Sequence, residues 1–286
     1  AETEATTKVT TTTTPTTTPT TTTTTVTTAV TFPPFSNGLY KQVQNMKQNY
    51  NGDTIAWVRV QGTNVNYAVT KKGENDGAND YYINHDFYNR YSAAGHVFMD
   101  FRARFGEKDS EQSDVITLYG HNQANNTMFG SIRKYREDSS FYETAPFIEL
   151  SSNYKDYDYV IFSYLITSGN YDDTDFRYWD MENMETQEDF DFYINSCRSR
   201  QMLDTGIDVQ YGDKLLTLST CYANEDNSRF IVVARRLRDG EVAGDLSTIQ
   251  RTDEYIQAQQ QAAAEAASIA AEEEASSKAA AEANAQ

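Results

Sequence analysis

The central part of the sequence is a series of short segments in which apolar and polar residues alternate, with few long helical patterns between them. An alternation of period two is typical of β-strands, because successive side chains point to opposite faces of a sheet. The longest such segment covers residues 157–167. The other predicted strands are residues 55–60, 65–69, 81–87, 95–101, 114–121, 147–150, 215–221 and 229–237. Short and mostly consecutive strands favour a mainly β fold, a closed or nearly closed antiparallel barrel, over a doubly wound sheet.

Helical periodicity occurs at a few places between these strands. Residues 37–48 carry apolar side chains at three- and four-residue intervals, which predicts an amphipathic helix near the start of the folded part. Residues 188–197 show the same spacing, and Thr186 is placed to cap that helix at its N-terminus. A shorter helix is expected around residues 128–135.

The two ends of the chain differ in composition from its middle. Residues 1–36 are rich in Thr and contain few large apolar side chains, so they cannot bury enough surface to offset the entropy lost on ordering. We interpret them as a disordered Thr/Pro-rich spacer. Residues 241–286 form an Ala/Glu-rich tail, which we expect to be partly helical or disordered. The predicted folded domain is therefore residues 37–240.

The charge of the chain limits its partners. A formal net charge of −18 at pH 7 argues against a nucleic-acid-binding protein, because an acidic surface repels phosphates. No run of apolar residues approaches the roughly 18–20 that a membrane-spanning helix needs. A Thr-rich spacer before an acidic, aromatic-rich domain resembles the stalk of a bacterial surface protein. We therefore expect the domain at the extracytoplasmic face of the membrane or in the cell wall, held by an anchor upstream of Ala1.

The chain has two cysteines, Cys197 and Cys221. Two cysteines are too few for a disulfide framework, and they lack the Cys-x-x-Cys spacing of a metal site, so we expect no metal and no cofactor. A single bridge between them is possible, although we interpret Cys197 as a buried thiol within its predicted helix. Cys221 ends an apolar segment, and from the residues alone it is equally well a buried strand residue or a nucleophile.

A nucleophilic cysteine needs a base or an electrostatic partner, because an ordinary thiol is mostly protonated at neutral pH. Of the three histidines, His121 ends a predicted strand beside a polar loop, whereas His85 and His96 lie within strand-like segments and are interpreted as structural. Loops at strand ends are where active sites are usually built. Arg229 begins the strand after Cys221, and its guanidinium is suited to binding an oxyanion or a peptide carbonyl.

Further arginines follow Arg229 near the end of the last predicted strand. We expect them to form ordinary salt bridges at the surface of the domain. These residues are Arg235, Arg236 and Arg238.

These residues resemble the catalytic motifs of sortases, in the order His, Cys, Arg. The motifs are Leu118-Tyr119-Gly120-His121-Asn122, Thr217-Leu218-Ser219-Thr220-Cys221 and Arg229. The resemblance covers roughly residues 37–238, and it is to class B sortases in particular. The segments that carry the class B likeness are residues 56–60 with 62–63, 81–82, 95–100 and 128–130, together with the helix before the last two strands.

The resemblance implies a closed eight-stranded sortase-type β-barrel with an N-terminal helix and an extra helix before the last two strands. It implies a membrane-anchored cysteine transpeptidase, similar to thiol proteases, of a Gram-positive-type bacterium. Such an enzyme cleaves secreted surface proteins after Thr in a C-terminal sorting signal, here of the Asn-Pro-x-Thr type. It then joins the acyl group to a peptidoglycan-precursor or pilin amine. The long Thr-rich lead and the tail after Leu237 depart from the family pattern.

The resemblance also implies roles for individual residues. Cys221 attacks the Thr carbonyl, His121 transfers protons, and Arg229 steadies the oxyanion or the backbone of the motif. Weaker expectations place four further residues at the substrate pocket. These are Asn122, Ser219, Thr220 and Tyr222.

Two other functions fit the sequence. One is a thiol peptidase that hydrolyses its substrate without transfer to an amine. The other is a non-catalytic surface adhesin built on a sortase-like barrel, which the spacer and the acidic charge would suit.

Overall fold

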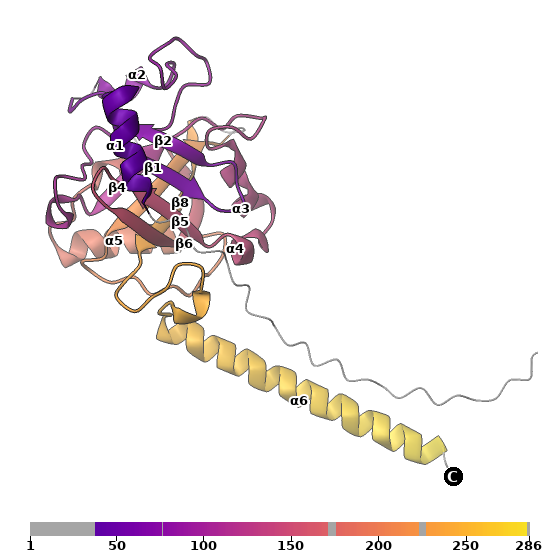
Figure 1. Ribbon diagram of the computed structural model, residues 1–286. Helices are drawn as coiled ribbons and strands as arrows, with labels where there is room; N and C mark the ends of the chain where they lie inside the picture. Colours follow the sequence, from indigo (N-terminus) through magenta and orange to yellow (C-terminus); the bar gives the residue numbers. More distant parts are fainter. Residues whose placement is uncertain (1–37, 76, 171–175, 223–226, 285–286) are drawn as a thin grey trace, which may run out of the picture.

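The fold is a closed β-barrel, seen in a computed structural model that describes residues 38–75, 77–170, 176–222 and 227–284 (Figure 1). The predicted spacer, residues 1–36, lies outside the described residues. The strands are β1 (Thr54–Val60), β2 (Asn66–Thr70), β3 (Phe98–Met99), β4 (Val115–Tyr119), β5 (Phe147–Ser151), β6 (Asp156–Ser168), β7 (Leu215–Cys221) and β8 (Ser228–Arg236). They follow one another around the barrel in the order β1-β2-β3-β4-β7-β8-β6-β5. The prediction of a mainly β, eight-stranded barrel is confirmed.

The barrel is mixed, so the prediction of an antiparallel barrel is wrong at two pairings. β2 pairs with β3 in parallel, and β4 pairs with β7 in parallel. In both cases the chain makes a long excursion before it returns to the same edge, and a long crossover is what parallel neighbours require. The excursion between β4 and β7 contains β5, β6 and the helix α5 (Gln187–Arg198).

Successive side chains of β7 and β8 point to opposite faces of the sheet, and both faces are buried. Leu216 and Leu218 point into the barrel. Leu215 and Ile231 belong to a second apolar cluster on the outer face, which α5 covers. Thr186 caps α5 as predicted, since its side chain accepts a hydrogen bond from Asp189 N and forms a capping box. The outer face of these strands is therefore a packed layer.

Cys197 lies in α5, where it is buried as a free thiol. The interpretation of this residue is confirmed, because Cys221 is also a free thiol and no bridge joins the two. Burial raises the pKa of the Cys197 thiol. Cys197 is thus a core residue without the character of a nucleophile.

The predicted N-terminal helix is α1 (Leu39–Asn49), which lies against β1 (Figure 1). Its N-terminus is fixed by Asp156, whose carboxylate accepts hydrogen bonds from Gly38 N at 2.5 Å and Tyr40 N at 2.8 Å. A carboxylate at this position also interacts favourably with the helix dipole. Short helices lie in the connections: α2 (Ala78–Tyr81), α3 (Lys134–Glu137), α4 (Phe141–Thr144) and the 3₁₀ turns η1 (Asp109–Glu111), η2 (Gly130–Arg133), η3 (Tyr178–Asp180) and η4 (Leu246–Thr248).

Two predicted strands are wrong or too long. Residues 81–87 form the end of α2 and a series of turns, with a single bridge between His85 and Tyr91. Residues 95–101 contain only the two-residue strand β3. For residues 81–87 the cause is a local turn. The Asp86 carboxylate accepts hydrogen bonds from the backbone N–H groups of Tyr88 and Arg90, which turns the chain back at this point.

The barrel is followed by a segment that returns to its surface and then by the long helix α6 (Asp253–Asn284). Arg235 is fully buried beneath this segment and forms an ion pair with Glu241 at 2.6 Å, so its prediction as a surface residue is wrong. Arg238 pairs with Asp208 at 2.7 Å and with Asp213 at 2.6 Å. The covering segment could not be predicted from the alternation of β8 alone.

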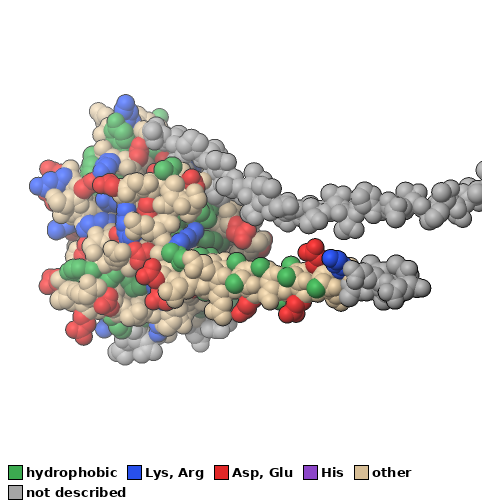
Figure 2. Space-filling view, turned by 90° about the horizontal axis from the view of Figure 1, so that it is seen from below, with side chains coloured by type: hydrophobic (Ala, Val, Ile, Leu, Met, Phe, Trp, Pro, Cys, Tyr) green, Lys and Arg blue, Asp and Glu red, His purple; other side chains and the backbone are tan. Residues whose placement is uncertain are grey.

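The helix α6 projects from the barrel (Figures 1 and 2). Its residues 256–278 are all exposed. With 32 residues it is about 48 Å long, given a rise of about 1.5 Å per residue. Among the helices of the described residues, none combines the length and the hydropathy needed to cross a membrane.

Candidate active site

Three strand ends meet at one edge of the barrel. β4 ends at Tyr119, and His121 follows two residues later. Cys221 is the last residue of β7, which runs parallel to β4 and ends beside it. Arg229 is the second residue of β8 and lies directly opposite Cys221 in the antiparallel ladder. Parallel pairing of β4 and β7 thus brings together two segments that are far apart in the sequence.

Cys221 and Arg229 share the outer face of the sheet. Side chains alternate along a strand, so Cys221 lies on the same face as Ser219, and Arg229 on the same face as Ile231 of the outer cluster. His121, Cys221 and Arg229 line one pocket of about 190 Å³. The other lining residues are Ile83, Phe98, Tyr119, Gly120, Ser219 and Thr220. The structure therefore brings the predicted thiol, imidazole and guanidinium together, outside the barrel core.

The imidazole of His121 is held by the segment before β3. Its Nε2 lies 2.7 Å from the carbonyl oxygen of Ile83. A carbonyl only accepts, so Nε2 donates the proton, and Nδ1 of the neutral ring is then an acceptor. A Cβ at Gly95 would lie 3.0 Å from Cδ2 of His121 and 2.5 Å from Ile83 O, so this close approach requires glycine. Sequence reasoning missed Ile83, because a backbone carbonyl leaves no trace in the residue type.

The guanidinium of Arg229 lies against backbone atoms and Gly169, which has no side chain. Its Nη1 donates hydrogen bonds to Asn227 O at 2.9 Å and to Ser228 O at 3.2 Å. A Cβ at Gly169 would lie 2.8 Å from Cζ of Arg229. The end of β6 thus leaves room for the guanidinium at the mouth of the pocket.

The four weaker predictions have different outcomes. Ser219 and Thr220 line the pocket, whereas Asn122 and Tyr222 are not among the residues found to line it. The hydroxyl of Ser219 lies 2.8 Å from the hydroxyl of Tyr178. Asn122 instead donates a hydrogen bond to the backbone oxygen of Cys221, and the ring of Tyr222 lies 4.9 Å from the guanidinium of Arg136.

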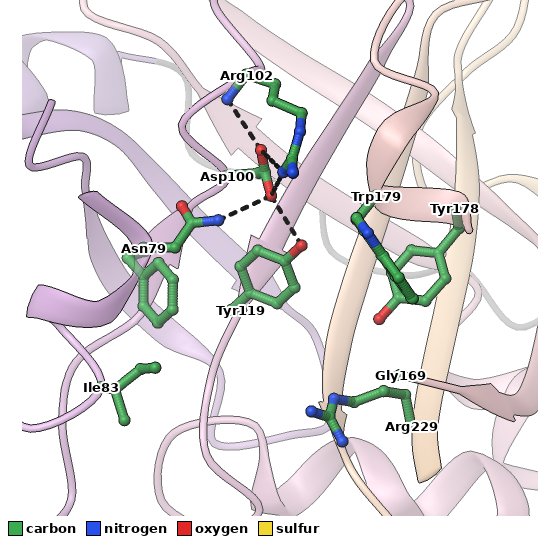
Figure 3. A pocket seen from close by; sticks show the side chains of 10 residues that line it. Asn79, Ile83, Asp100, Arg102, Tyr119, Gly169, Tyr178, Trp179 and Arg229 are labelled. Carbon is green, nitrogen blue, oxygen red and sulfur yellow. Dashed lines mark hydrogen bonds and ion pairs between the residues drawn. The ribbon is translucent and has the colours of Figure 1, made fainter. Parts of the chain in front are cut away.

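A second chamber of about 190 Å³ adjoins the first, and Figure 3 shows the side chains that line it. It shares Ile83, Phe98, Tyr119 and Arg229 with the first pocket. Its further lining residues are Asn79, Asp100, Arg102, Gly169, Tyr178 and Trp179. The two chambers therefore adjoin each other and form one groove that includes the thiol of Cys221.

A buried carboxylate braces one wall of the second chamber (Figure 3). Asp100 is 1% exposed and accepts hydrogen bonds from Asn79 Nδ2 at 3.0 Å and Tyr119 OH at 2.9 Å. Arg102 bonds to Asp100 at 3.1 Å and to Asp180 at 3.2 Å, which joins this wall to η3. Burial raises the pKa of Tyr119 well above its ordinary value, so its hydroxyl stays a neutral donor.

Tyr178 carries the opposite wall. Its side chain is buried, and burial raises its pKa to about 12, although the charge of Arg229 acts in the opposite direction. Its hydroxyl therefore stays protonated beside Ser219 at neutral pH. The sequence did not predict that Asp100 and Tyr178 line this chamber, because contacts with residues distant in the sequence place them there.

The other two histidines, His85 and His96, line neither of the two chambers. His96 is buried and lies against the rings of Tyr67 and Phe87, and burial lowers its pKa to about 4, so it is neutral near pH 7. The ring of His85 stacks on Tyr81 with centroids 4.1 Å apart. Within the part of the chain that the structure describes, no group of three or more His, Cys, Asp or Glu side chains is arranged to hold a metal ion.

Comparison with known proteins agrees with this arrangement. A family model described as the sortase domain matches residues 58–237. Sortase B of Staphylococcus aureus (strain NCTC 8325 / PS 47) is 31% identical over 195 residues, which cover 67% of this chain and 73% of the relative. The residues that the family model matches include His121, Cys221 and Arg229.

Solved structures give the same result. The S. aureus sortase B–substrate complex has a TM-score of 0.57 and 26% identity, covering 70% of this chain and 92% of that one. A crystal structure of sortase B complexed with triglycine has a TM-score of 0.58 and 28% identity, covering 70% and 87%. The prediction of the family is confirmed: the chain belongs to the sortases, the family of cysteine transpeptidases, and within it to class B.

Proposed function

We propose that this sortase cleaves a C-terminal sorting signal after a Thr residue, through a thioester on Cys221, and transfers the acyl group to an amine of the cell wall or of a pilin. The observation that carries the proposal is the convergence of His121, Cys221 and Arg229 on one pocket of about 190 Å³. These side chains supply a nucleophile, a proton carrier and an oxyanion partner, which are the groups that acyl transfer needs.

The first half-reaction forms the thioester. The Sγ of Cys221, as thiolate, attacks the Thr carbonyl carbon, and the carbonyl electron pair moves onto the oxygen. Arg229 stabilises this oxyanion by hydrogen bonds from its guanidinium. When the C–N bond breaks, His121 as imidazolium gives its proton to the leaving amine. The C-terminal fragment leaves, and the acyl group remains on sulfur.

The second half-reaction forms the new amide. His121 is now neutral and takes a proton from the incoming amine as its nitrogen attacks the thioester carbonyl. The C–S bond then breaks and returns Cys221 to its starting state. Water can replace the amine, and the outcome is then hydrolysis, as in a thiol protease. We place transfer first because the chain matches the sortase family model and a sortase B relative.

The proposed substrate is a secreted surface protein with an Asn-Pro-x-Thr type signal. The resemblance to class B sortases supports this signal, and the relatives include the S. aureus sortase B–substrate complex. The sortase B complexed with triglycine supports a short peptide amine as the acceptor. An extracytoplasmic location, with a membrane anchor and access to cell-wall amines, completes the proposal.

The test is an amine-dependence assay. The enzyme is incubated with a fluorogenic Asn-Pro-x-Thr peptide, with and without triglycine, and the products are identified by mass spectrometry. We expect a thioacyl adduct on Cys221 and a triglycine-ligated product. A product yield indifferent to the amine favours the hydrolase. Loss of all turnover in Cys221→Ala, with retained folding, is expected for the enzyme, whereas unchanged cell-wall attachment of surface proteins in that variant favours the adhesin.

A further inference from the structure

The parallel ladder between β4 and β7 ends just before the catalytic residues. Its last pair is Tyr119 with Ser219, and Gly120 N donates one more hydrogen bond to Ser219 O at 3.2 Å. His121 and Cys221 both lie beyond this point. The main-chain ladder therefore does not by itself fix the spacing between imidazole and thiol.

Two side chains continue the link past the end of the ladder. Thr220 Oγ1 donates a hydrogen bond to Gly120 O at 2.6 Å, from the β7 side to the β4 side. Asn122 Nδ2 donates a hydrogen bond to Cys221 O at 3.0 Å, in the opposite direction. The first contact precedes His121 and Cys221 in both segments, and the second joins Cys221 to the residue after His121. The two catalytic residues are thus bracketed by side-chain bonds.

The carboxamide of Asn122 has a defined orientation. In the reverse orientation its oxygen would face the oxygen of Cys221 at 3.0 Å, and two acceptors repel. Its Oδ1 is buried and has no hydrogen-bond partner in the described structure, which carries a cost in free energy. The bond to Cys221 O is thus the contact that fixes the orientation of this carboxamide.

The loop that carries Asn122 is itself braced. Asn122 forms a β-bridge with Met128, and Phe129 N donates a hydrogen bond to His121 O at 3.0 Å. Met128 N in turn donates to the hydroxyl of Tyr67 at 3.0 Å. Because these bonds fix the loop, the Asn122 amide can hold the end of β7 at Cys221 in place.

We propose that Asn122 is a positioning residue of the transfer reaction, which holds the backbone of Cys221 and so sets the approach of its thiol to His121. Thr220 supplies the second link. Asn122 acts without lining the pocket. The inference rests on the proposed role of Cys221 as the nucleophile. It adds that the thiol must be held at a fixed position relative to His121.

The test compares Asn122→Ala and Asn122→Asp with Asn125→Ala in the full chain. Asn125 lies in the same loop, and its side chain accepts hydrogen bonds only from Thr127 in the described contacts, so its variant is the matched control. We expect Asn122→Ala to lower kcat for thioester formation by ~10-fold to 100-fold, because small misplacement of reacting groups has effects of this size. KM should change less than about twofold, since substrate contacts are retained. Asn122→Asp keeps the shape but replaces the donor with an acceptor, and should lose more.

A second readout separates positioning from general damage. The rate of Cys221 alkylation by iodoacetamide is measured for Asn122→Ala in the wild-type and in the His121→Ala background, with thermal melting as a control for folding. We expect Asn122→Ala to change the alkylation rate in the wild-type background. In the His121→Ala background we expect no change, because no imidazole remains beside which the thiol is positioned. Equal losses in both backgrounds, or a kcat equal to that of Asn125→Ala, overturn the inference. Retained turnover in Cys221→Ala would instead overturn the proposed function.

Discussion

Cys221 and Arg229 are directly paired across the antiparallel ladder of β7 and β8. Paired residues in such a ladder project from the same face, with Cα atoms roughly 4.5–5.5 Å apart. The sheet therefore places both residues on one face, where they line the same pocket, before any ligand is bound. This preorganisation is the physical basis for an electrostatic role of Arg229.

The first prediction concerns the charge and shape of this guanidinium. Arg229→Ala should lower kcat for thioester formation by ~10²-fold to 10³-fold, the range found for removal of an oxyanion donor. Arg229→Lys keeps the positive charge but loses the planar guanidinium, so its kcat should lie between those of the wild type and Arg229→Ala. Steady-state kinetics with a sorting peptide measure both. Arg90→Ala, which removes a surface pair with Asp86, is the control and should leave kcat unchanged. Unaltered kcat in Arg229→Ala would contradict an oxyanion role.

The second prediction concerns the bare backbone beside Arg229. A Cβ at Gly169 would lie 2.8 Å from Arg229 Cζ and 2.8 Å from Asn227 O, so Gly169→Ala must displace one or both. We expect kcat to fall ~10-fold. Gly52→Ala is the control, since its Cβ meets nothing within 4 Å. In an Arg229→Ala background the Gly169 change should have little further effect, and a full additional loss there would count against this contact.

The third prediction concerns the buried ion pair that holds the segment after β8. Arg235 and Glu241 form two hydrogen bonds of 2.6 Å, and their side chains are 0% and 2% exposed. Removing one partner leaves a buried charge, so Glu241→Ala should lower the free energy of unfolding by ~3–5 kcal/mol. Glu137→Ala, at an exposed pair, should cost at most ~1 kcal/mol. Urea denaturation compares the two.

The same pair predicts a response to acid. Hydrogen bonds from Arg235 and from the backbone of Arg238 and Gln250 outweigh burial and lower the pKa of Glu241 to about 2. In the unfolded chain a glutamate titrates near ~4.3. Its contribution to stability is therefore complete above that value and is lost as the pH falls towards 2. Glu241→Gln should unfold with a weaker pH dependence in this window, and an unchanged slope would contradict the assignment.

The fourth prediction has the opposite sign. Burial raises the pKa of Glu149 to about 7, and the charge of Arg59 offsets only part of this effect. Asp158, opposite Glu149 in the β5–β6 ladder, has a pKa raised to about 6 by burial and by the charge of Asp156.

The raised pKa values fix the direction of the pH effect. Since the unfolded pKa of a glutamate is near ~4.3, stability from Glu149 is complete below that value and lost as the pH rises through 7. Glu149→Gln should reduce the fall in melting temperature between these limits without abolishing it, because Asp158 still titrates. Equal slopes for wild type and variant would exclude Glu149 as a source.

Alternation predicted most strands, because each of them has a face that must be buried. It was wrong for residues 81–87, where the hydrogen bonds of Asp86 favour turns over an extended chain. It could not show that β4 and β7 are parallel neighbours, since pairing between distant strands depends on the path of the whole chain. Arg235 was misplaced for a related reason: a segment later in the sequence covers it.

The site was predicted where chemistry and position coincide. His121 and Cys221 stood out as reactive side chains at the ends of predicted strands. Ile83 did not, because its contribution is a backbone carbonyl. Asn122 was expected near the substrate, and only the structure shows that its amide binds Cys221 O instead.

The parallel pairing of β4 with β7 also has a consequence for the order of folding. The hydrogen bond between Thr220 and Gly120 joins residues 100 positions apart, and β5, β6 and α5 lie between them. Closing so long a loop costs entropy that only the contacts of the intervening elements can recover, so this pairing should form late. A partly folded chain then carries the thiol of Cys221 without its imidazole neighbour. The capacity to form a thioester should therefore arise only when the barrel closes.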